Sequence, residues 1–213
     1  MPSPRSILQL RIDLAGADPS IWRRIQVPAD YSFWDLHVAI QSAFGWNDTH
    51  LHEFQVPGGR WPDRRFGVPD VDFAIADRPT QPGWEHRIAD FLTPQSPRIR
   101  YLYDFGDIWL HEVILEECGQ AEPGKRYPRC VAGARAAPPD DSGGVHGYAH
   151  LLSVLADPDH EDHGEIREWL AWVRRKRGRF DPEAFDEQAV RFASPGPRLK
   201  RVLAWLADAE GAP

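Results

Sequence analysis

The sequence predicts an α+β fold in which an antiparallel or mixed β-sheet packs against helices, and in which the C-terminal part is helical. Apolar residues alternate with polar ones in several segments before residue 116, as in half-buried strands. After residue 146 they recur three to four positions apart, as in amphipathic helices. The 213 residues include 9 Trp and 10 Phe, enough apolar area for one packed core, so we expect a single domain over residues 1–213.

The first part of the chain predicts two strands, a helix and a third strand. Alternation over residues 6–14 and 21–27, with a turn between them, predicts an opening hairpin. Ser32 is a favourable N-cap and Gly45 a natural residue after a helix end, so a helix is expected over 32–44. Strand character resumes over 50–56.

The rest of the sequence, from residue 57 onward, predicts loops, a second hairpin and several helices. Residues 57–83 carry turn-forming residues without a sustained period, apart from a short apolar stretch at 71–75, and predict loops; a brief helix follows near 85–92. The strongest strand patterns are 99–103 and 108–115, joined by the tight turn Asp104-Phe105-Gly106-Asp107. Helices are expected at 147–156, 165–177, 183–192 and 197–208.

Charge and composition restrict the function classes. The formal charge of −7 opposes nonspecific attraction to nucleic acid or an anionic membrane. Because apolar runs stay well short of the roughly 18–20 residues that span a bilayer, and the N-terminus alternates instead of forming a signal-peptide core, we expect a cytoplasmic protein without membrane contact.

Cys118 and Cys130 are the only cysteines, so they form at most one disulfide and are expected to be reduced. They are a candidate thiol site. With His146 and His150 they imitate a zinc set, although the cysteine spacing is far wider than zinc sites use.

Three histidines are the candidate metal ligands: His50, His52 and His111. The first two share one face of an expected strand and the third projects from another strand, so the three imidazoles can meet around zinc or a similar ion. Asp104 or Asp107 would position a water. The competing and favoured interpretation is that these histidines satisfy hydrogen bonds on a partly buried sheet.

Three further clusters have structural explanations that we favour over binding. The basic run Arg174, Arg175, Lys176, Arg177 and Arg179 ends an expected helix, and its alternative is contact with nucleic acid or an acidic partner. Acidic residues at 157, 159, 161 and 168 imitate a calcium loop but lack its central glycine. Gly143-Gly144 precedes a helix as a phosphate loop would, without the full motif.

Four segments of the sequence together carry a resemblance to a known protein family: IWRRIQVPADYSFWDLHVAIQSAFGWNDTHLHEF at 21–54, YLYDFGDIWLHEVILE at 101–116, CVAGARAAPPDDSGGVHGYAHLLSVLADPDHEDH at 130–163 and FDPEAFD at 180–186. Through them residues 5–192 resemble the plasmid pRiA4b ORF-3-like family, also described as passenger proteins of a mobile insertion element, with 193–213 as a C-terminal helix and tail. The resemblance implies an α+β fold with an antiparallel sheet. The mobile-element description concerns genetic neighbourhood and implies no resolvase chemistry.

Function is predicted in three forms. The leading expectation is an uncharacterised soluble accessory or binding protein, associated with a plasmid or mobile element and non-catalytic, which engages an unknown macromolecule, protein or nucleic acid; no cofactor is predicted for it. One alternative is a metal-dependent hydrolase or nuclease that uses the histidine cluster and a divalent metal such as zinc. The other is a nucleic-acid-binding module that uses the basic run at 174–179.

Overall fold

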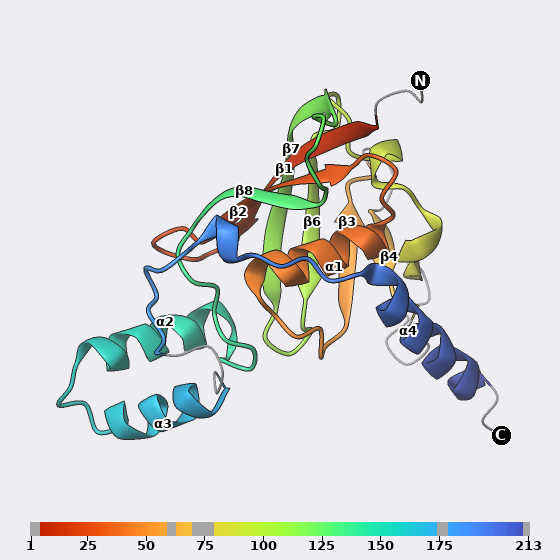
Figure 1. The fold of residues 1–213 in the computed structure, drawn as a ribbon. Helices are drawn as coiled ribbons and strands as arrows, with labels where there is room; N and C mark the ends of the chain where they lie inside the picture. Colours follow the sequence, from red (N-terminus) through yellow and green to blue (C-terminus); the bar gives the residue numbers. More distant parts are fainter. Residues whose placement is uncertain (1–4, 59–62, 70–78, 174–178, 211–213) are drawn as a thin grey trace.

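A computed structural model describes residues 5–58, 63–69, 79–173 and 179–210 of the chain, and an eight-stranded sheet forms its centre (Figure 1). In chain order the strands are β1 (Ser6–Leu14), β2 (Trp22–Pro28), β3 (His52–Val56), β4 (Arg64–Gly67), β5 (Gln81–Pro82), β6 (Arg98–Tyr103), β7 (Trp109–Gln120) and β8 (Arg129–Ala134). In space their order is β5-β4-β3-β6-β7-β1-β2-β8. All neighbours pair antiparallel except β4 and β5, so the sheet is mixed and the predicted α+β class is confirmed.

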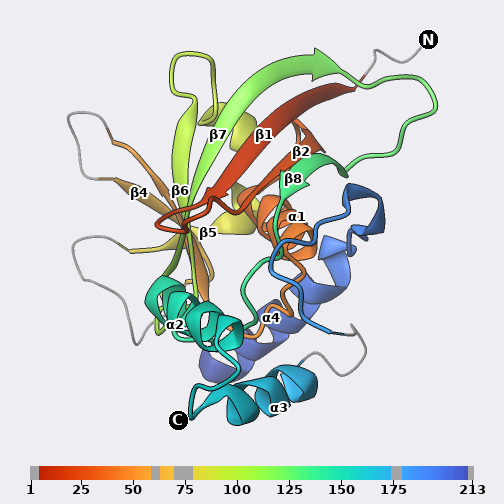
Figure 2. The same ribbon diagram turned by 90° about the vertical axis from the view of Figure 1, so that its left-hand side faces the viewer.

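The helices are α1 (Phe33–Phe44), α2 (Gly144–Ala156), α3 (His163–Val173) and α4 (Pro195–Glu210). Figure 1 shows α1 lying across one face of the sheet, with α2 and α3 as a pair at one end of the molecule and α4 at the other. The turned view in Figure 2 shows that the sheet twists between β4 and β8. Such a twist is usual in sheets of L-amino acids. Among the described residues, the helices are too short or too polar to cross a membrane.

Helix α1 follows from local sequence. The Ser32 side chain accepts a hydrogen bond from the Asp35 backbone, and the Asp35 carboxylate accepts one from the Ser32 backbone N–H at 2.9 Å, which forms a capping box. Gly45 ends the helix in the left-handed conformation with φ of 76°, where a residue with a Cβ atom is strained. The predicted helix over 32–44 is therefore confirmed, and its buried face packs on the sheet.

The sheet has one core face and one face lined by ion pairs. Leu8, Leu10, Ile12 and Leu14 alternate toward the core, as predicted for this segment. The intervening residues point to the other face, where Arg24 donates a hydrogen bond of 2.7 Å to Glu116 across the strands. This hydrogen bond holds the pKa of Glu116 below its ordinary value.

Several predicted elements need correction. Strands β4 and β5 lie in the segment 57–83, which the sequence predicts as loops, and β8 lies where it predicts no element. The expected strand at 50–56 begins only at His52, and the segment 85–92 forms short 3₁₀ turns (Gly83–Glu85 and Ile88–Asp90) in place of a helix. The apolar stretch 71–75 and the end of the expected helix 165–177 lie outside the described residues.

The predicted helix over 183–192 is wrong, because only the single 3₁₀ turn Glu187–Ala189 forms there. The Phe185 ring instead covers the Arg23 guanidinium at 4.0 Å and lies directly over Gly133 of β8. This packing against the edge of the sheet replaces helical geometry.

Candidate metal centre

Three loops meet at one end of the sheet and are tied together by hydrogen bonds. They are residues 45–51 between α1 and β3, residues 104–108 between β6 and β7, and residues 135–143 before α2. Trp46 Nε1 donates to the Pro138 carbonyl at 2.8 Å, which joins the first loop to the third. The Gly143 backbone N–H donates to the Asp107 carboxylate at 2.9 Å, which joins the third to the second.

Close backbone contact fixes the second and third loops against each other. A Cβ atom on Gly144 would lie 2.4 Å from the Asp107 carbonyl oxygen, so only glycine fits there. The loops also hold Asp48, Asp104 and Asp141 in the left-handed backbone region, with φ of 58°, 59° and 61°. Aspartate is among the residues that tolerate this conformation best.

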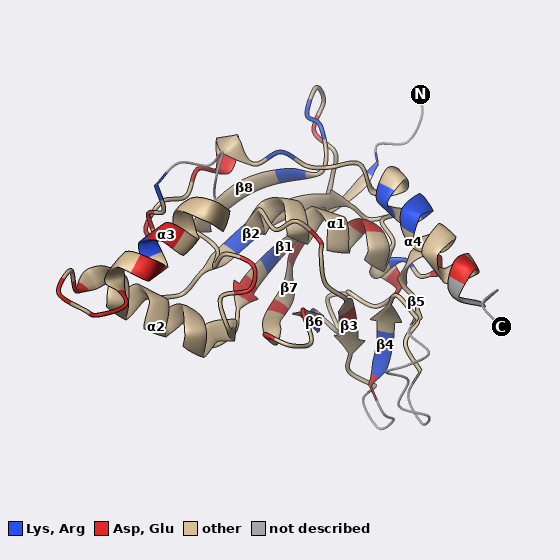
Figure 3. Cartoon of the chain, turned by 90° about the horizontal axis from the view of Figure 1, so that it is seen from below, with Lys and Arg blue, Asp and Glu red and all other residues tan. Residues whose placement is uncertain are grey.

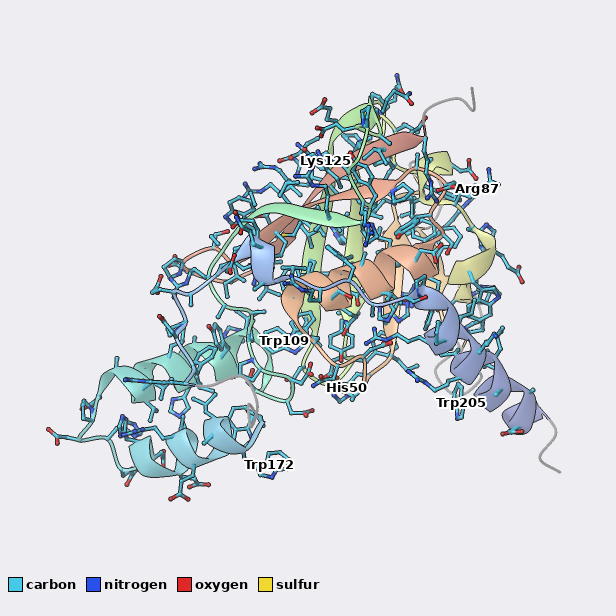
Figure 4. All side chains as sticks on the ribbon, viewed as in Figure 1. His50, Arg87, Trp109, Lys125, Trp172 and Trp205 are labelled. Atoms are coloured by element: carbon cyan, nitrogen blue, oxygen red, sulfur yellow. The ribbon has the colours of Figure 1, made fainter. Side chains whose placement is uncertain are left out.

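One side-chain group at this junction, the open group, consists of His50, Asp104 and Asp141, one residue from each loop. His50 Nε2 lies 3.1 Å from Asp141 Oδ1 and 3.7 Å from Asp104 Oδ2, and the three ligand atoms lie within 4.8 Å of one another. Asp104 is largely buried, and its other oxygen accepts a hydrogen bond from the Gly106 backbone at 2.9 Å, which fixes the carboxylate. Figure 4 shows His50 at the edge of the sheet from which this junction projects.

The spacing in the open group suits a shared cation. Two ligands that are each about 2.0–2.2 Å from a tetrahedrally coordinated ion lie roughly 3.3–3.6 Å apart. The measured separations of 3.1 and 3.7 Å bracket this range. Imidazole with two carboxylates is a donor set for zinc or manganese. Figure 3 shows acidic residues on the loop between β6 and β7 and on the loop before α2.

A second group, the buried group, consists of His37, Asp48 and His52 and lies deeper in the core. His37 uses both ring nitrogens: Nε2 lies 2.7 Å from Asp48 Oδ1 and Nδ1 lies 2.8 Å from the Tyr101 hydroxyl. The rings of His37 and His52 stack with centroids 3.5 Å apart and planes within 5°. An imidazole nitrogen binds a metal ion with a lone pair that lies in the plane of the ring. Because the planes of the two stacked rings are nearly parallel and do not meet, the two histidines cannot bind the same ion.

Electrostatics agree with this assignment of the buried group. Burial lowers the pKa of His52 well below its ordinary value, and the adjacent His37 lowers it further. Burial also lowers the pKa of His37, although Asp48 opposes the change. Both rings are therefore neutral at physiological pH, and the group is a hydrogen-bonded part of the core.

The predicted three-histidine set is not formed. Since β3 begins at His52, His50 lies on the preceding loop and joins the open group, whereas His52 points into the core beside His37. His111 is buried on β7, where its Nδ1 lies 3.0 Å from the Trp109 carbonyl oxygen, and burial lowers its pKa to about 4. The structure thus distributes the three histidines over three environments.

Cys118 and Cys130 do not form one thiol site. Cys118 lies on β7 and Cys130 on β8, with β1 and β2 between them, so at about 4.8 Å per strand they lie roughly 14 Å apart. Both are free, and burial raises the pKa of Cys130. A joint disulfide or zinc site is therefore excluded by distance.

The other predicted clusters are also accounted for. Arg174, Arg175, Lys176 and Arg177 lie outside the described residues, and Arg179 lines a cavity of about 960 Å³ between α2 and α3. The Gly143 N–H donates to a carboxylate, so a phosphate is disfavoured at that helix start. Asp157, of the imitated calcium loop, accepts a hydrogen bond from the Asp159 backbone at 3.1 Å in a local turn.

Asp141, His37 and Asp48 are site residues that were missed from the sequence. His37 and Gln41 are polar residues four positions apart among the buried, mostly apolar residues of α1, which is a recognisable pattern for a buried polar network. Asp141 lies in the turn-rich run 138–144, where its proximity to His50 depends entirely on tertiary structure.

Comparisons with known proteins show the family to which the chain belongs. The model of the family described as plasmid pRiA4b ORF-3-like protein matches residues 6–189. The uncharacterized protein y4hQ of Sinorhizobium fredii is 34% identical over 164 residues, which are 77% of this chain and 80% of that protein. The crystal structure of MM3350 from Methanosarcina mazei Go1, a protein of unknown function, is 39% identical with a TM-score of 0.79, and the match covers 89% of this chain and 100% of that one. The chain therefore belongs to the plasmid pRiA4b ORF-3-like family.

Proposed function

We propose that this protein binds a divalent cation through His50, Asp104 and Asp141 and is a cation-dependent hydrolase. The supporting observation is that one imidazole nitrogen and two carboxylate oxygens, each from a different loop, lie within 4.8 Å of one another. The ties between the three loops hold these atoms in place before an ion arrives, so little ordering accompanies binding.

The chemistry follows from the donor set. His50, Asp104 and Asp141 would hold the ion through three ligand atoms, and a zinc ion held in this way would supply hydroxide at neutral pH by lowering the pKa of a water to about 7. Of the three functional forms that the sequence predicts, this favours the metal-dependent hydrolase or nuclease, with the ligand set changed from three histidines to His50 and two aspartates. A cytoplasmic location is part of the proposal.

The other forms stay predictions. A non-catalytic accessory role in plasmid or mobile-element biology, with a protein or nucleic-acid partner, draws its support from the family description alone. Nucleic-acid binding through residues 174–179 depends on a segment that lies almost entirely outside the described residues.

The test is cation binding by chelator-washed protein. Zinc and manganese are titrated separately, bound metal is measured by elemental analysis, and unfolding is followed with and without metal. At a free concentration one hundred times Kd, a cation that binds only the folded state adds about 2.7 kcal/mol to the free energy of unfolding. We expect one ion per chain.

Variants locate the ion. Asp141→Asn and His50→Ala should abolish both the bound metal and the added stability, since each removes a ligand. Asp159→Asn and His146→Ala are matched controls, because these exposed residues lie outside the open group, and both should behave as wild type. Equal metal binding in all four variants, or none in wild type, would disprove the proposal.

A further inference from the structure

A cavity of about 210 Å³ lies beside the open group, between the loop that enters β3 and helix α4. His50 lines this cavity as well as belonging to the open group. One side of the wall includes Trp34 of α1 and His52 of β3. The other side includes Arg198, Arg201 and Trp205 of α4. Figure 4 shows His50 and Trp205 at the same edge of the molecule.

Helix α4 is held in place as one wall of this cavity. Trp34 Nε1 donates to the Pro195 carbonyl at 3.2 Å, at the start of α4. Leu199, Val202 and Leu206 pack against the small apolar cluster of Trp34, Val38 and Val68. The side chains of α4 that line the cavity therefore start from a fixed backbone.

Three buried nitrogen atoms of the wall residues have no hydrogen-bond partner among the described residues: His50 Nε2, His52 Nε2 and Arg198 Nη1. His52 is only 3% exposed. Arg198 Nη1 lies 3.3 Å from Asp48 Oδ2 but outside hydrogen-bond geometry. A buried N–H without an acceptor is costly, and arginine only donates, so the wall is suited to an oxygen-bearing ligand.

The charge of the wall favours an anion. Among the described residues of the wall, Arg198 and Arg201 are cations and Asp48 is the one carboxylate, which already has His37 as a hydrogen-bond partner. Arg201 is exposed and has no ion pair among the described residues. Arg198 also lies in the first turn of α4, where the helix dipole is positive. Figure 3 shows basic residues along α4.

The size and apolar surface of the cavity restrict the ligand further. A volume of about 210 Å³ lies below the roughly 300–1,000 Å³ of typical ligand sites, so it holds a phosphate and little more than one ring. Trp205 is 52% exposed, which leaves its indole face free to stack on a flat group.

We propose that this cavity binds a small phosphomonoester that carries a single flat ring, and that this ester is the substrate of the cation-dependent hydrolase. The substrate assignment rests on the proposed function, whereas binding in the cavity does not. In the reaction, the oxygen of a water bonds to phosphorus while the bond between phosphorus and the ester oxygen breaks. The water's proton passes to the leaving alkoxide, which yields an alcohol and inorganic phosphate without any oxidant or reductant.

Phenyl phosphate is the probe, measured by isothermal titration calorimetry with chelator-treated protein. Arg201→Ala should raise its Kd about tenfold, the effect of one charge-assisted hydrogen bond of about 1.4 kcal/mol. Lys200→Ala is the matched control, since Lys200 is the adjacent exposed cation on α4 and lies outside the cavity wall, and its Kd should equal wild type.

A second pair of variants tests the ring. Trp205→Ala should weaken phenyl phosphate about fivefold and leave inorganic phosphate unchanged, because stacking acts only on the ring. The control Trp172→Ala removes another exposed tryptophan, on α3, and should have no effect. Undetectable binding in wild type, or equal Kd values for Arg201→Ala and Lys200→Ala, would overturn the cavity assignment.

The two proposals fail in different ways. If the wild-type protein binds phenyl phosphate but binds neither zinc nor manganese, the result supports the proposed ligand of the cavity and overturns the proposed hydrolase function. When both ligands bind, release of phenol on adding metal, lost in Asp141→Asn and retained in Asp159→Asn, supports the substrate class. Absence of phenol release from protein loaded with zinc or manganese overturns it.

Discussion

The buried group and the open group use the same side-chain types, and their histidines 50 and 52 are separated by one residue, yet they have opposite physical roles. In the buried group the two imidazole planes are parallel at 3.5 Å and the nearby carboxylate already has a histidine partner. In the open group a single imidazole faces two carboxylates at 3.1 and 3.7 Å. The orientation of the rings, more than the identity of the residues, separates a core network from a cation site.

Removing the buried group should give the largest loss of stability. His37→Ala leaves a cavity in the core and removes one of the two hydrogen-bond partners of the Tyr101 hydroxyl, and we expect a loss of about 3 kcal/mol in the free energy of unfolding. His50→Ala in chelated protein should cost less than about 1 kcal/mol, because that side chain is partly exposed. Urea unfolding of both variants measures the difference. Equal losses would remove the distinction between the groups.

Acid should destabilise the core through its neutral histidines, and His111 gives a measurable share. Its pKa in the folded state is about 4, below the ordinary 6.5, so the unfolded state binds the proton more tightly. Its contribution to stability is therefore complete above pH 6.5 and is lost as the pH falls from 6.5 toward 4, on the order of 3 kcal/mol in total.

The check is the free energy of unfolding of wild type and His111→Phe across this pH range in chelated protein. The variant should show a shallower slope between pH 6.5 and 4, while His37 and His52 supply the slope that remains. Parallel curves for the two proteins would contradict the assignment.

The smallest expected effect separates helix stability from cation binding. Ser32→Ala removes the capping box of α1, which carries His37 but none of the open group. We expect a loss of about 1 kcal/mol in chelated protein. The stability added by metal should be unchanged within error, and a reduced metal effect would show that the open group depends on the helix.

The fold was predictable from sequence where local pattern and burial agree. Strand β1 alternates cleanly, and α1 has both caps, so each was found within a residue or two. Strand β8 escaped because all of its residues are half-buried, which leaves no alternation to detect, and β5 has only the two residues Gln81–Pro82. Such strands exist through pairing with distant partners.

The candidate site was predictable only in part, for a related reason. His50 and Asp104 follow from the ends of predicted strands, and both belong to the open group. Asp141 lies on a loop that is held in position by hydrogen bonds to Trp46 and Asp107, which are far away in the sequence. The stacking of His37 on His52 brings together a helix and a strand, which periodicity alone does not orient.

The position of β1 inside the sheet, between β7 and β2, has a consequence for how the chain is made. Ser6 at the start of β1 pairs with Gln120 at the end of β7, so β1 cannot complete its pairing until residue 120 has left the ribosome. Until then the apolar face of the β1–β2 hairpin has only α1 to cover it. Such distant pairing slows folding and exposes strand edges during synthesis, so we expect yields in the cell to depend on the rate of translation and on chaperones.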